Sequence, residues 1–184
     1  MQTTEKVYYH VYNRGANKTE TFLDNEDYNF FLKKLNWYSK NNRTKILAFA
    51  LMPNHFHLFL FFNEGSGNLS ALKGNLLNSY TKYFNKKYSR SGVLFQGPTV
   101  CKKVEDGGHQ IWLLKYITDN PVKAGLVNHS WNWPFSSAHE FKFNNKTRIC
   151  DHAEVMSMFE SVAEFNKFIW DESDEAKEKY FTRW

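Results

Sequence analysis

Hydrophobic and polar residues alternate along residues 7–14, which is typical of a β-strand with two different faces. One face of this strand would carry hydrophobic side chains, those of Val7, Tyr9 and Val11. The other face would carry polar and aromatic side chains, those of Tyr8, His10, Tyr12 and Arg14. Two interpretations stay open for the second face: a nucleic-acid-binding surface, or the solvated side of an ordinary amphipathic strand.

The rest of the chain shows further strand and helix periodicities. Strands are predicted over residues 44–52, 55–62 and 100–104, and helices over residues 24–40 and 69–88. Asp24 or Asn25 is suited to cap the first of these helices. Pro53 and Asn54 are a turn signal between two predicted strands, so we expect a β-hairpin there.

The element order is β-α-β-β-α-β-α, and its last helix follows Gly107-Gly108. This order predicts an α+β fold, with a ferredoxin-like antiparallel sheet, two helices on one face and the last helix on the other. Residues 1–140 would form this domain, and residues 141–184 a helical C-terminal appendage packed on the same domain. The appendage shows helical spacing followed by a charged tail, over residues 153–159, 162–170 and 172–179.

Two histidines stand two residues apart at the start of the predicted strand 55–62. In a strand, His55 and His57 would point to the same face of the sheet. The opposite face would be wholly apolar and therefore buried, with Phe56, Leu58, Leu60 and Phe62. Two adjacent imidazoles are half of a divalent-metal site, although histidines at the end of a strand also bond simply to backbone or water.

Tyr116 and Asn120 stand four residues apart in the last helix, so they would share one helical face. Together with the histidine pair, they suggest a metal ion that polarises a phosphate and a tyrosine that attacks it. Each also has an ordinary interpretation: Tyr116 as a half-buried residue with its hydroxyl at the surface, and Asn120 as the cap of a new helix starting at Pro121. His10 is a further candidate ligand.

The composition favours a globular protein that binds a polyanion. Of the 184 residues, 42% are hydrophobic, which is enough for a real core, and the net charge is +5 with a pI near 9.1. Aromatic residues reach 18%, and rings beside basic side chains suit unpaired bases, although most rings belong to the core. Six lysines are candidate phosphate contacts or members of a solvated surface: Lys73, Lys82, Lys86, Lys87, Lys102 and Lys103.

Several protein classes are disfavoured. Cys101 and Cys150 form no CxxC pair, which argues against a disulfide framework or a cysteine zinc site. The sequence has no signal peptide and no apolar run near the roughly 18 residues of a membrane span, so we expect a cytoplasmic protein without a membrane partner. The HExxH, Walker A and GxSxG motifs are absent, which disfavours zincins, P-loop enzymes and serine hydrolases.

Five strings occur in a fixed order, at residues 9–15, 52–58, 91–97, 116–126 and 133–137. This set resembles the REP-associated tyrosine transposases, relatives of the single-tyrosine HUH transposases, and the resemblance covers residues 6–140. It implies the HUH endonuclease fold, with His55 and His57 as metal ligands. It also implies Tyr116 as the nucleophile, Asn120 as a third ligand, and Mg²⁺ or Mn²⁺ as the cofactor.

The same resemblance implies a metal-dependent endonuclease and strand transferase that cuts single-stranded DNA beside hairpins through a covalent 5′-phosphotyrosine. Its partner would be single-stranded or hairpin DNA, and the enzyme would be a monomer or a homodimer. The residues expected to bind DNA are Tyr8, His10, Tyr12, Arg14, Lys73, Lys82, Lys86, Lys87, Lys102 and Lys103. Pro98 stands where relatives carry a basic residue, so Lys102 and Lys103 are expected to take over a phosphate contact there.

Two other functions stay open. One is a protein that binds palindromic or hairpin DNA without cutting it, and the other is a metal-dependent RNA or nucleotide phosphoesterase on a ferredoxin-like scaffold. A pure DNA-binding protein needs neither the histidine pair nor Tyr116. A phosphoesterase could use the histidines but would not need the tyrosine.

Overall fold

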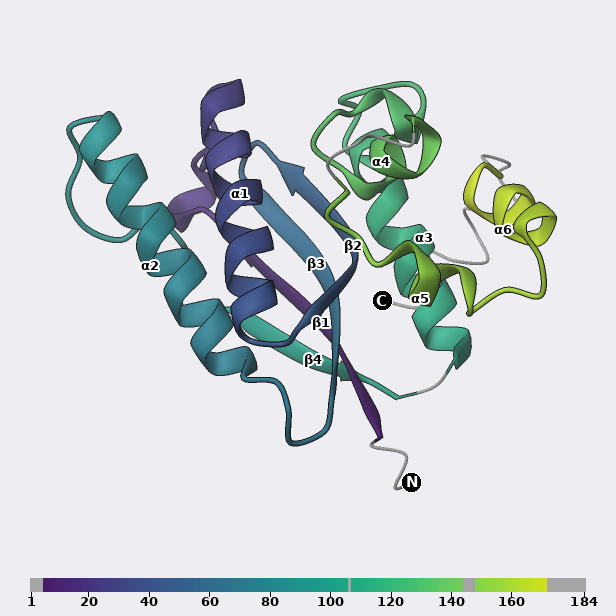
Figure 1. Ribbon diagram of the computed structural model, residues 1–184. Coiled ribbons are helices and arrows are strands. Elements are labelled where there is room, and N and C mark those ends of the chain that lie inside the picture. Colours follow the sequence, from purple (N-terminus) through teal and green to yellow (C-terminus); the bar gives the residue numbers. More distant parts are fainter. Residues whose placement is uncertain (1–4, 106, 144–147, 172–184) are drawn as a thin grey trace.

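The sheet has four antiparallel strands in the order β2-β3-β1-β4 (Figure 1). The computed structural model describes residues 5–105, 107–143 and 148–171. The strands are β1 (Lys6–Arg14), β2 (Lys45–Met52), β3 (His55–Asn63) and β4 (Val100–Val104). All four agree with the predicted strands to within one residue at either end, and Pro53-Asn54 forms the turn of the β2–β3 hairpin.

Two helices, α1 (Asn25–Asn41) and α2 (Leu69–Lys87), cover one face of the sheet (Figure 1). Alternate side chains of the strands meet them in one hydrophobic cluster, which includes Val11, Phe31, Leu35, Leu51, Phe56, Leu58, Leu60, Leu76 and Tyr80. The predicted apolar side of β3 is therefore buried, except for Phe62 at its end, which is only partly covered. Asp24 caps α1, since its carboxylate accepts hydrogen bonds from two backbone N–H groups of the first turn.

Helix α3 (Gly107–Lys123) lies against the other face of the sheet, as predicted (Figure 1). It packs there through a second hydrophobic cluster, which includes Ala48, Ala50, Phe59, Phe61, Val104, Trp112, Leu113 and Ile117. The helix begins at Gly107 and continues through Asn120 and Pro121, so the alternative of a new helix capped by Asn120 is wrong. Pro121 is tolerated in the last turn because its missing N–H removes only one intrahelical hydrogen bond there.

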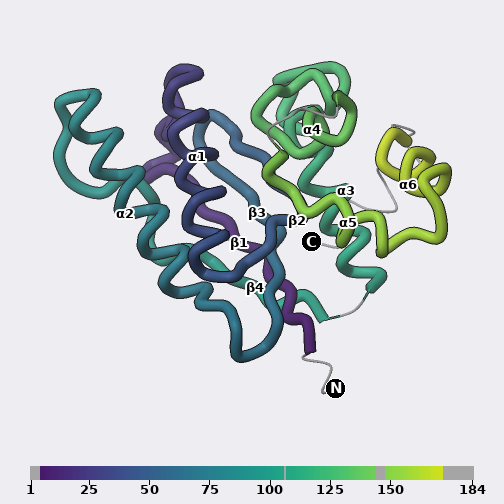
Figure 2. Tube along the Cα trace, in the orientation of Figure 1, coloured from purple at the N-terminus to yellow at the C-terminus, as the bar shows by residue number. Residues whose placement is uncertain are grey.

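Residues 155–170 pack on the α3 side of the sheet (Figure 2), whereas Phe135, Ile149 and Cys150 pack into the cluster under α1 and α2. The remaining elements are the short 3-10 helices η1 (Ala16–Lys18) and η2 (Ser130–Asn132), and the helices α4 (Ser137–Phe143), α5 (His152–Met156) and α6 (Val162–Ile169). The predicted domain boundary after residue 140 stays a prediction, and the charged tail at 172–179 lies outside the described residues. Within the described ranges, no helix combines the length and hydropathy of a membrane span.

Lys115 ties this C-terminal part to α3. Its side chain is almost fully buried, and Nζ donates a hydrogen bond to the carbonyl oxygen of Ile169 at 3.1 Å. The same Nζ forms an ion pair with Asp119 at 2.8 Å. A buried charge is stable only when it is paired and hydrogen-bonded, so these contacts hold the end of α6 against the helix that carries Tyr116.

Candidate active site

The two predicted histidines and Tyr116 come together between the sheet and α3. Strands β1 and β3 pair so that Tyr12 lies opposite His57 and Arg14 lies opposite His55. Directly opposed residues of antiparallel strands point to the same face, so these four side chains share the face under α3. Tyr116 projects onto them from α3, with its ring centroid 5.5 Å from that of His57. The strand register and α3 together build the site.

His57 is buried and bonded to a third histidine, His10. The Nε2 atom of His10 lies 2.9 Å from Nδ1 of His57, so one of these nitrogens donates a hydrogen bond to the other. Burial, together with the charges of Lys102 and His109, lowers the pKa of His10 to about 3. Burial and the neighbouring histidines also hold the pKa of His57 well below its ordinary value. Both rings are therefore neutral near pH 7, with lone pairs available for hydrogen bonds or a metal ion.

His55 is held between two asparagines. Its Nδ1 lies 2.6 Å from Oδ1 of Asn54, and its Nε2 lies 3.3 Å from Oδ1 of Asn120. An amide oxygen only accepts hydrogen bonds, so the short contact to Asn54 places the proton of the neutral ring on Nδ1. Burial lowers the pKa of His55, which keeps the ring neutral. The Nε2 lone pair of His55 then faces the lone pairs of the Asn120 oxygen, an arrangement that favours a cation between them.

This set of donor atoms fits a divalent metal ion. Adjacent ligands of an octahedral ion with bonds of about 2.1 Å lie about 3 Å apart, close to the 3.3 Å between Nε2 of His55 and Oδ1 of Asn120. His57 adjoins them, with its ring centroid 5.3 Å from that of His55. In the part of the chain that the structure describes, no three His, Cys, Asp or Glu side chains are placed to hold a metal. Two imidazoles and one amide oxygen would leave positions for water and a substrate phosphate, as Mg²⁺ and Mn²⁺ require.

Tyr116 is half-buried and firmly placed. Its ring stacks on Trp112, one turn earlier in α3, with centroids 5.0 Å apart, and Nζ of Lys123 lies 5.6 Å from its centroid. Burial raises the pKa of Tyr116, whereas a hydrogen bond from the Asn120 side chain lowers it. Asn120 therefore links the tyrosine to His55. The hydroxyl is protonated near neutral pH and has to lose its proton before it can act as a nucleophile.

An open cavity of about 560 Å³ leads to the histidines. It is lined by Tyr12, Asn13, Arg14, Lys18, Asn54, His55, His57, Gln96, Pro98 and Val100. Nε of Arg14 donates a hydrogen bond to Gln96 at 2.8 Å, and Nδ2 of Asn13 donates one to Thr99 at 2.9 Å. These bonds fix the loop before β4 against the end of β1. Pro98, the position at which this sequence departs from the family pattern, lies in this loop and lines the cavity.

Five of these lining residues were not among the predicted site residues, and they are Asn13, Lys18, Asn54, Gln96 and Val100. Asn54 is predictable, because it directly precedes His55 in the hairpin turn. Lys18 and Gln96 come from loops whose positions depend on tertiary packing, and no periodicity indicates that they approach the histidines.

The residues of β1 that were expected to bind DNA separate into two groups. Tyr12 and Arg14 line the cavity beside the histidines, within reach of a bound strand. The Tyr8 hydroxyl instead donates a hydrogen bond to Glu154 at 2.9 Å, and its ring stacks on β3. His10 is only 6% exposed and bonds to its histidine neighbour. The prediction of His10 as a DNA contact is therefore corrected, because packing keeps its ring from a DNA strand, whereas that of Tyr8 stays a prediction.

Lys102 and Lys103 lie on opposite faces of the sheet. Lys102 pairs with His10 and so points to the α3 face, whereas Lys103 pairs with Tyr9 and points to the α1 and α2 face. The two side chains cannot contact one phosphate together. On the face of the histidines, the expected phosphate contact is therefore open to Lys102 only, and the expectation is corrected for Lys103.

The other four lysines lie on α2, and they are Lys73, Lys82, Lys86 and Lys87. Since α2 covers the face opposite to the histidines, DNA in the cavity would have to pass around the sheet to reach them (Figure 1). Lys87 pairs with the carboxylates of Asp24, Glu26 and Asp27 at 2.8–2.9 Å. This ion cluster joins α2 to the start of α1, so the prediction of Lys87 as a phosphate contact is corrected to a structural role.

Comparisons with known proteins place the chain in a family. A family model described as "Transposase IS200 like" matches residues 3–120. A protein named as a REP-associated tyrosine transposase, from Haemophilus influenzae, is 31% identical over 103 residues, which cover 50% of this chain and 58% of that protein. The match thus spans less than two thirds of that relative's length.

Two solved structures resemble this one. A REP-associated tyrosine transposase bound to a REP hairpin matches with a TM-score of 0.59 and 20% identity, over 74% of this chain and 78% of that chain. A transposase from Deinococcus radiodurans matches with a TM-score of 0.47 and 19% identity, over 65% of this chain and 94% of that chain. The first of these similarities confirms the predicted α+β fold with its antiparallel sheet.

Proposed function

The chain belongs to the family of IS200-like transposases, and we propose that it is a metal-dependent endonuclease and strand transferase for single-stranded DNA beside hairpins. One observation carries this proposal. Tyr116 lies beside the His55–His57 pair, and Asn120 contacts both the tyrosine and His55. A DNA-binding protein that never cuts has no use for this arrangement, and a hydrolytic phosphoesterase has no use for the tyrosine.

In the proposed reaction, the hydroxyl oxygen of Tyr116 attacks the phosphorus of a DNA phosphodiester. A bond forms between this oxygen and phosphorus, and the bond from phosphorus to the 3′ oxygen of the preceding nucleotide breaks. The tyrosine loses its proton, and the departing 3′ oxygen gains one. The 5′ phosphate stays on Tyr116, and its ester bond remains available for transfer to another 3′ hydroxyl.

The surrounding residues would bind and orient the reacting groups. The two histidines and Asn120 would hold Mg²⁺ or Mn²⁺, which supplies a Lewis acid at the scissile phosphate. The Asn120 amide also donates a hydrogen bond to the Tyr116 oxygen, which favours the deprotonated nucleophile. Tyr12 and Arg14 line the cavity and would hold the adjacent nucleotide, the first by stacking on the base and the second by contacting the phosphate.

His10 would act through His57 as a positioning residue. Nε2 of His57 offers a lone pair to a metal only when the ring proton lies on Nδ1. That Nδ1 is 2.9 Å from Nε2 of His10, which accepts its hydrogen bond when His10 is neutral. His10 then carries its own proton on Nδ1, a buried atom without a hydrogen-bond partner among the described residues. A buried N–H without a partner destabilises the fold, and metal binding has to offset this cost. His10 would therefore select the tautomer of His57 at some expense in stability.

Replacing His10 by leucine should weaken Mn²⁺ binding by about 10- to 100-fold, the usual effect of removing the partner of a ligating histidine. Calorimetric titration with Mn²⁺ measures this change without any DNA. The variant His10→Gln keeps an oxygen that can accept the hydrogen bond of His57, so it should retain most of the affinity. Equal affinities of the wild type and a folded His10→Leu protein would contradict the positioning role.

We propose that the substrate is a DNA hairpin with a single-stranded flank. The structurally similar transposase is bound to a REP hairpin, and the net charge of +5 favours a polyanion. A flanked hairpin should bind more tightly than a duplex of matched sequence, because only the flank offers unstacked bases to Tyr12 in the cavity. Affinity should fall with salt, each neutralised phosphate adding about 0.7 to 0.9 to the log–log slope. Anisotropy titrations over a salt series measure both effects, and equal affinity for the duplex would refute this substrate.

The proposed chemistry also predicts a covalent protein–DNA adduct that survives denaturation. Neither a non-cutting DNA-binding protein nor a hydrolytic phosphoesterase would form such an adduct. A denaturing gel, run after incubation with single-stranded DNA and Mn²⁺, tests the proposed function directly.

A further inference from the structure

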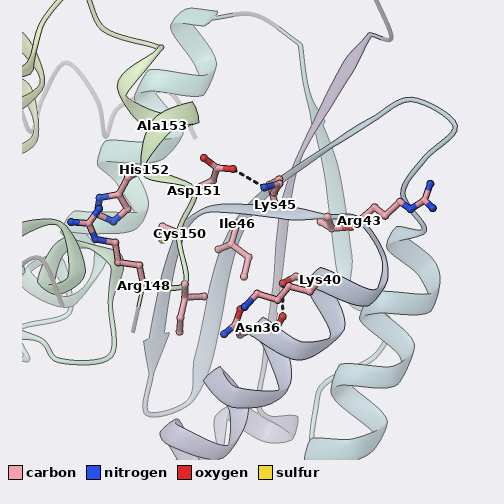
Figure 3. Close-up of a pocket in the computed structure, with 13 residues that line it drawn as sticks. Asn36, Lys40, Arg43, Lys45, Ile46, Arg148, Cys150, Asp151, His152 and Ala153 are labelled. Atoms are coloured by element: carbon pink, nitrogen blue, oxygen red, sulfur yellow. Dashed lines mark hydrogen bonds and ion pairs between the residues drawn. The ribbon is translucent and has the colours of Figure 1, made fainter. Parts of the chain in front are cut away.

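A second groove runs along the outer side of α1, away from the histidines. It consists of two adjoining cavities of about 550 and 440 Å³, whose walls share Asn36 and Ile149. One wall is α1 with part of β2, and the other is contributed by residues 134–140 and 148–153, of which Figure 3 shows the second range. This second wall lies beyond residues 3–120, which the family model matches, so the groove depends on the C-terminal part of the chain.

Backbone hydrogen bonds attach the second wall to the edge of β2 at two points. Near the end of β2, the N–H of Leu51 donates to the carbonyl oxygen of Phe135 at 3.0 Å. Near its start, the N–H of Asp151 donates to the carbonyl oxygen of Ile46 at 2.7 Å. Between these points the chain leaves the edge and forms α4. The groove is therefore fixed by the backbone and does not depend on side-chain rotamers alone.

Positive charge predominates along the groove. Five cationic side chains line it, those of Lys33, Lys40, Arg43, Lys45 and Arg148. The lining carboxylates already have partners: Asp151 pairs with Lys45 at 3.1 Å, and Glu140 accepts hydrogen bonds from two backbone N–H groups and contacts His152 at 3.1 Å. The other four cations form no ion pair with any described residue. A polyanion in the groove would neutralise them.

The cations are placed differently around the larger cavity. Figure 3 shows Lys40 and Arg148 on two sides of it and Lys45 bonded to Asp151, whereas Arg43 turns outward at the rim. Apart from Arg43, the lining cations without a carboxylate partner are Lys33, Lys40 and Arg148. Their separation along α1 and across the groove suits several phosphates of one backbone better than one small anion.

We propose that this groove binds phosphates in the duplex stem of the hairpin whose flank enters the catalytic cavity. The proposal rests on the proposed function, because one DNA molecule would occupy both sites. Ile46, at the groove, is six residues from Met52, which pairs with His55, and six strand residues span about 20 Å. That length corresponds to about six base pairs of B-DNA. A longer stem could reach the groove, and a stem of three base pairs could not.

The test compares a long-stem and a short-stem hairpin that carry the same single-stranded flank. The variant Lys33→Ala/Lys40→Ala/Arg148→Ala removes three exposed side chains, so the fold should be preserved. The control Lys34→Ala/Arg90→Ala/Lys167→Ala removes the same charge from positions that line neither the groove nor the catalytic cavity. The long stem should bind more tightly than the short stem to the wild type and to the control, but not to the groove variant.

For the long stem, the groove variant should lower the log–log salt slope by up to about 2.7, or about 0.9 for each lost phosphate contact. For the short stem, its affinity and its yield of covalent adduct should equal those of the wild type. If the groove variant binds the long stem as the control does, the proposal is overturned, and the three cations are ordinary solvated surface charges. If adduct never forms while the stem-length effect persists, the proposed function fails and the groove assignment stands.

The same cations could bind a small phosphorylated ligand in place of DNA phosphates. Inorganic phosphate and a nucleoside triphosphate, titrated separately while tryptophan fluorescence is followed, distinguish it from DNA. Saturable binding that the groove variant loses, without any stem-length effect on DNA affinity, would assign the groove to a small anion and overturn the DNA proposal. Absence of such binding, together with the stem-length effect, supports it.

Discussion

Replacing Tyr116 by phenylalanine should abolish the covalent attachment of the protein to DNA. The change removes the only atom that attacks phosphorus and keeps the ring that stacks on Trp112. It also removes the hydrogen bond with Asn120, which costs about 0.5–1.5 kcal/mol, so folding and DNA binding should change little. Wild type and variant are incubated with single-stranded DNA and Mn²⁺, and adduct is measured on a denaturing gel.

The matched control is Tyr12→Phe, which removes the hydroxyl of another tyrosine beside the same histidines. This variant should still form adduct, because its ring can stack on a base as before. An undiminished yield of adduct in Tyr116→Phe would contradict the assignment of Tyr116 as the nucleophile. Loss of adduct in both variants would show that the cavity tolerates no change, and Tyr116 would then have to be identified by mapping the labelled peptide.

Local periodicity predicts the strands and the common direction of His55 and His57. Because the side chains of a strand alternate, two histidines at i and i+2 share a face wherever the strand lies. The bond between His10 and His57 could not be predicted in this way. It depends on the register of β1 against β3, and a shift by one residue would turn His10 to the other face. No pattern within either strand fixes that register.

The errors among the lysines have two different causes. Lys102 and Lys103 are adjacent in a predicted strand, so the sequence already implies that they point to opposite faces. Lys87 is different, because its partner Asp24 lies 63 positions earlier in the chain and no helical periodicity connects them. The groove beside α1 could not be predicted for the same reason as the Lys87 ion pairs, since its walls meet only through long-range packing.

Replacing either histidine of the His55–His57 pair by alanine should abolish both cleavage and the binding of Mn²⁺. Each variant removes one of three proposed ligands, and the loss should exceed the roughly 10- to 100-fold effect of a partner residue. His57 is buried, so His57→Ala also leaves a cavity that costs about 1–3 kcal/mol, to be checked by thermal unfolding. His55 is more exposed, and His55→Ala keeps the test valid if the first variant is unstable.

Calorimetric titration with Mn²⁺ separates a loss of metal binding from a loss of activity. The wild type should show one site, and both variants should show none. His139→Ala is the matched control, because His139 lies in α4, where its ring contacts Phe143, and should leave that site unchanged. EDTA should stop cleavage by the wild type, and added Mn²⁺ should restore it, because the two neutral imidazoles and Asn120 remain in place. Full cleavage in EDTA, or wild-type Mn²⁺ affinity in a folded His57→Ala protein, would mean that these side chains hold no metal.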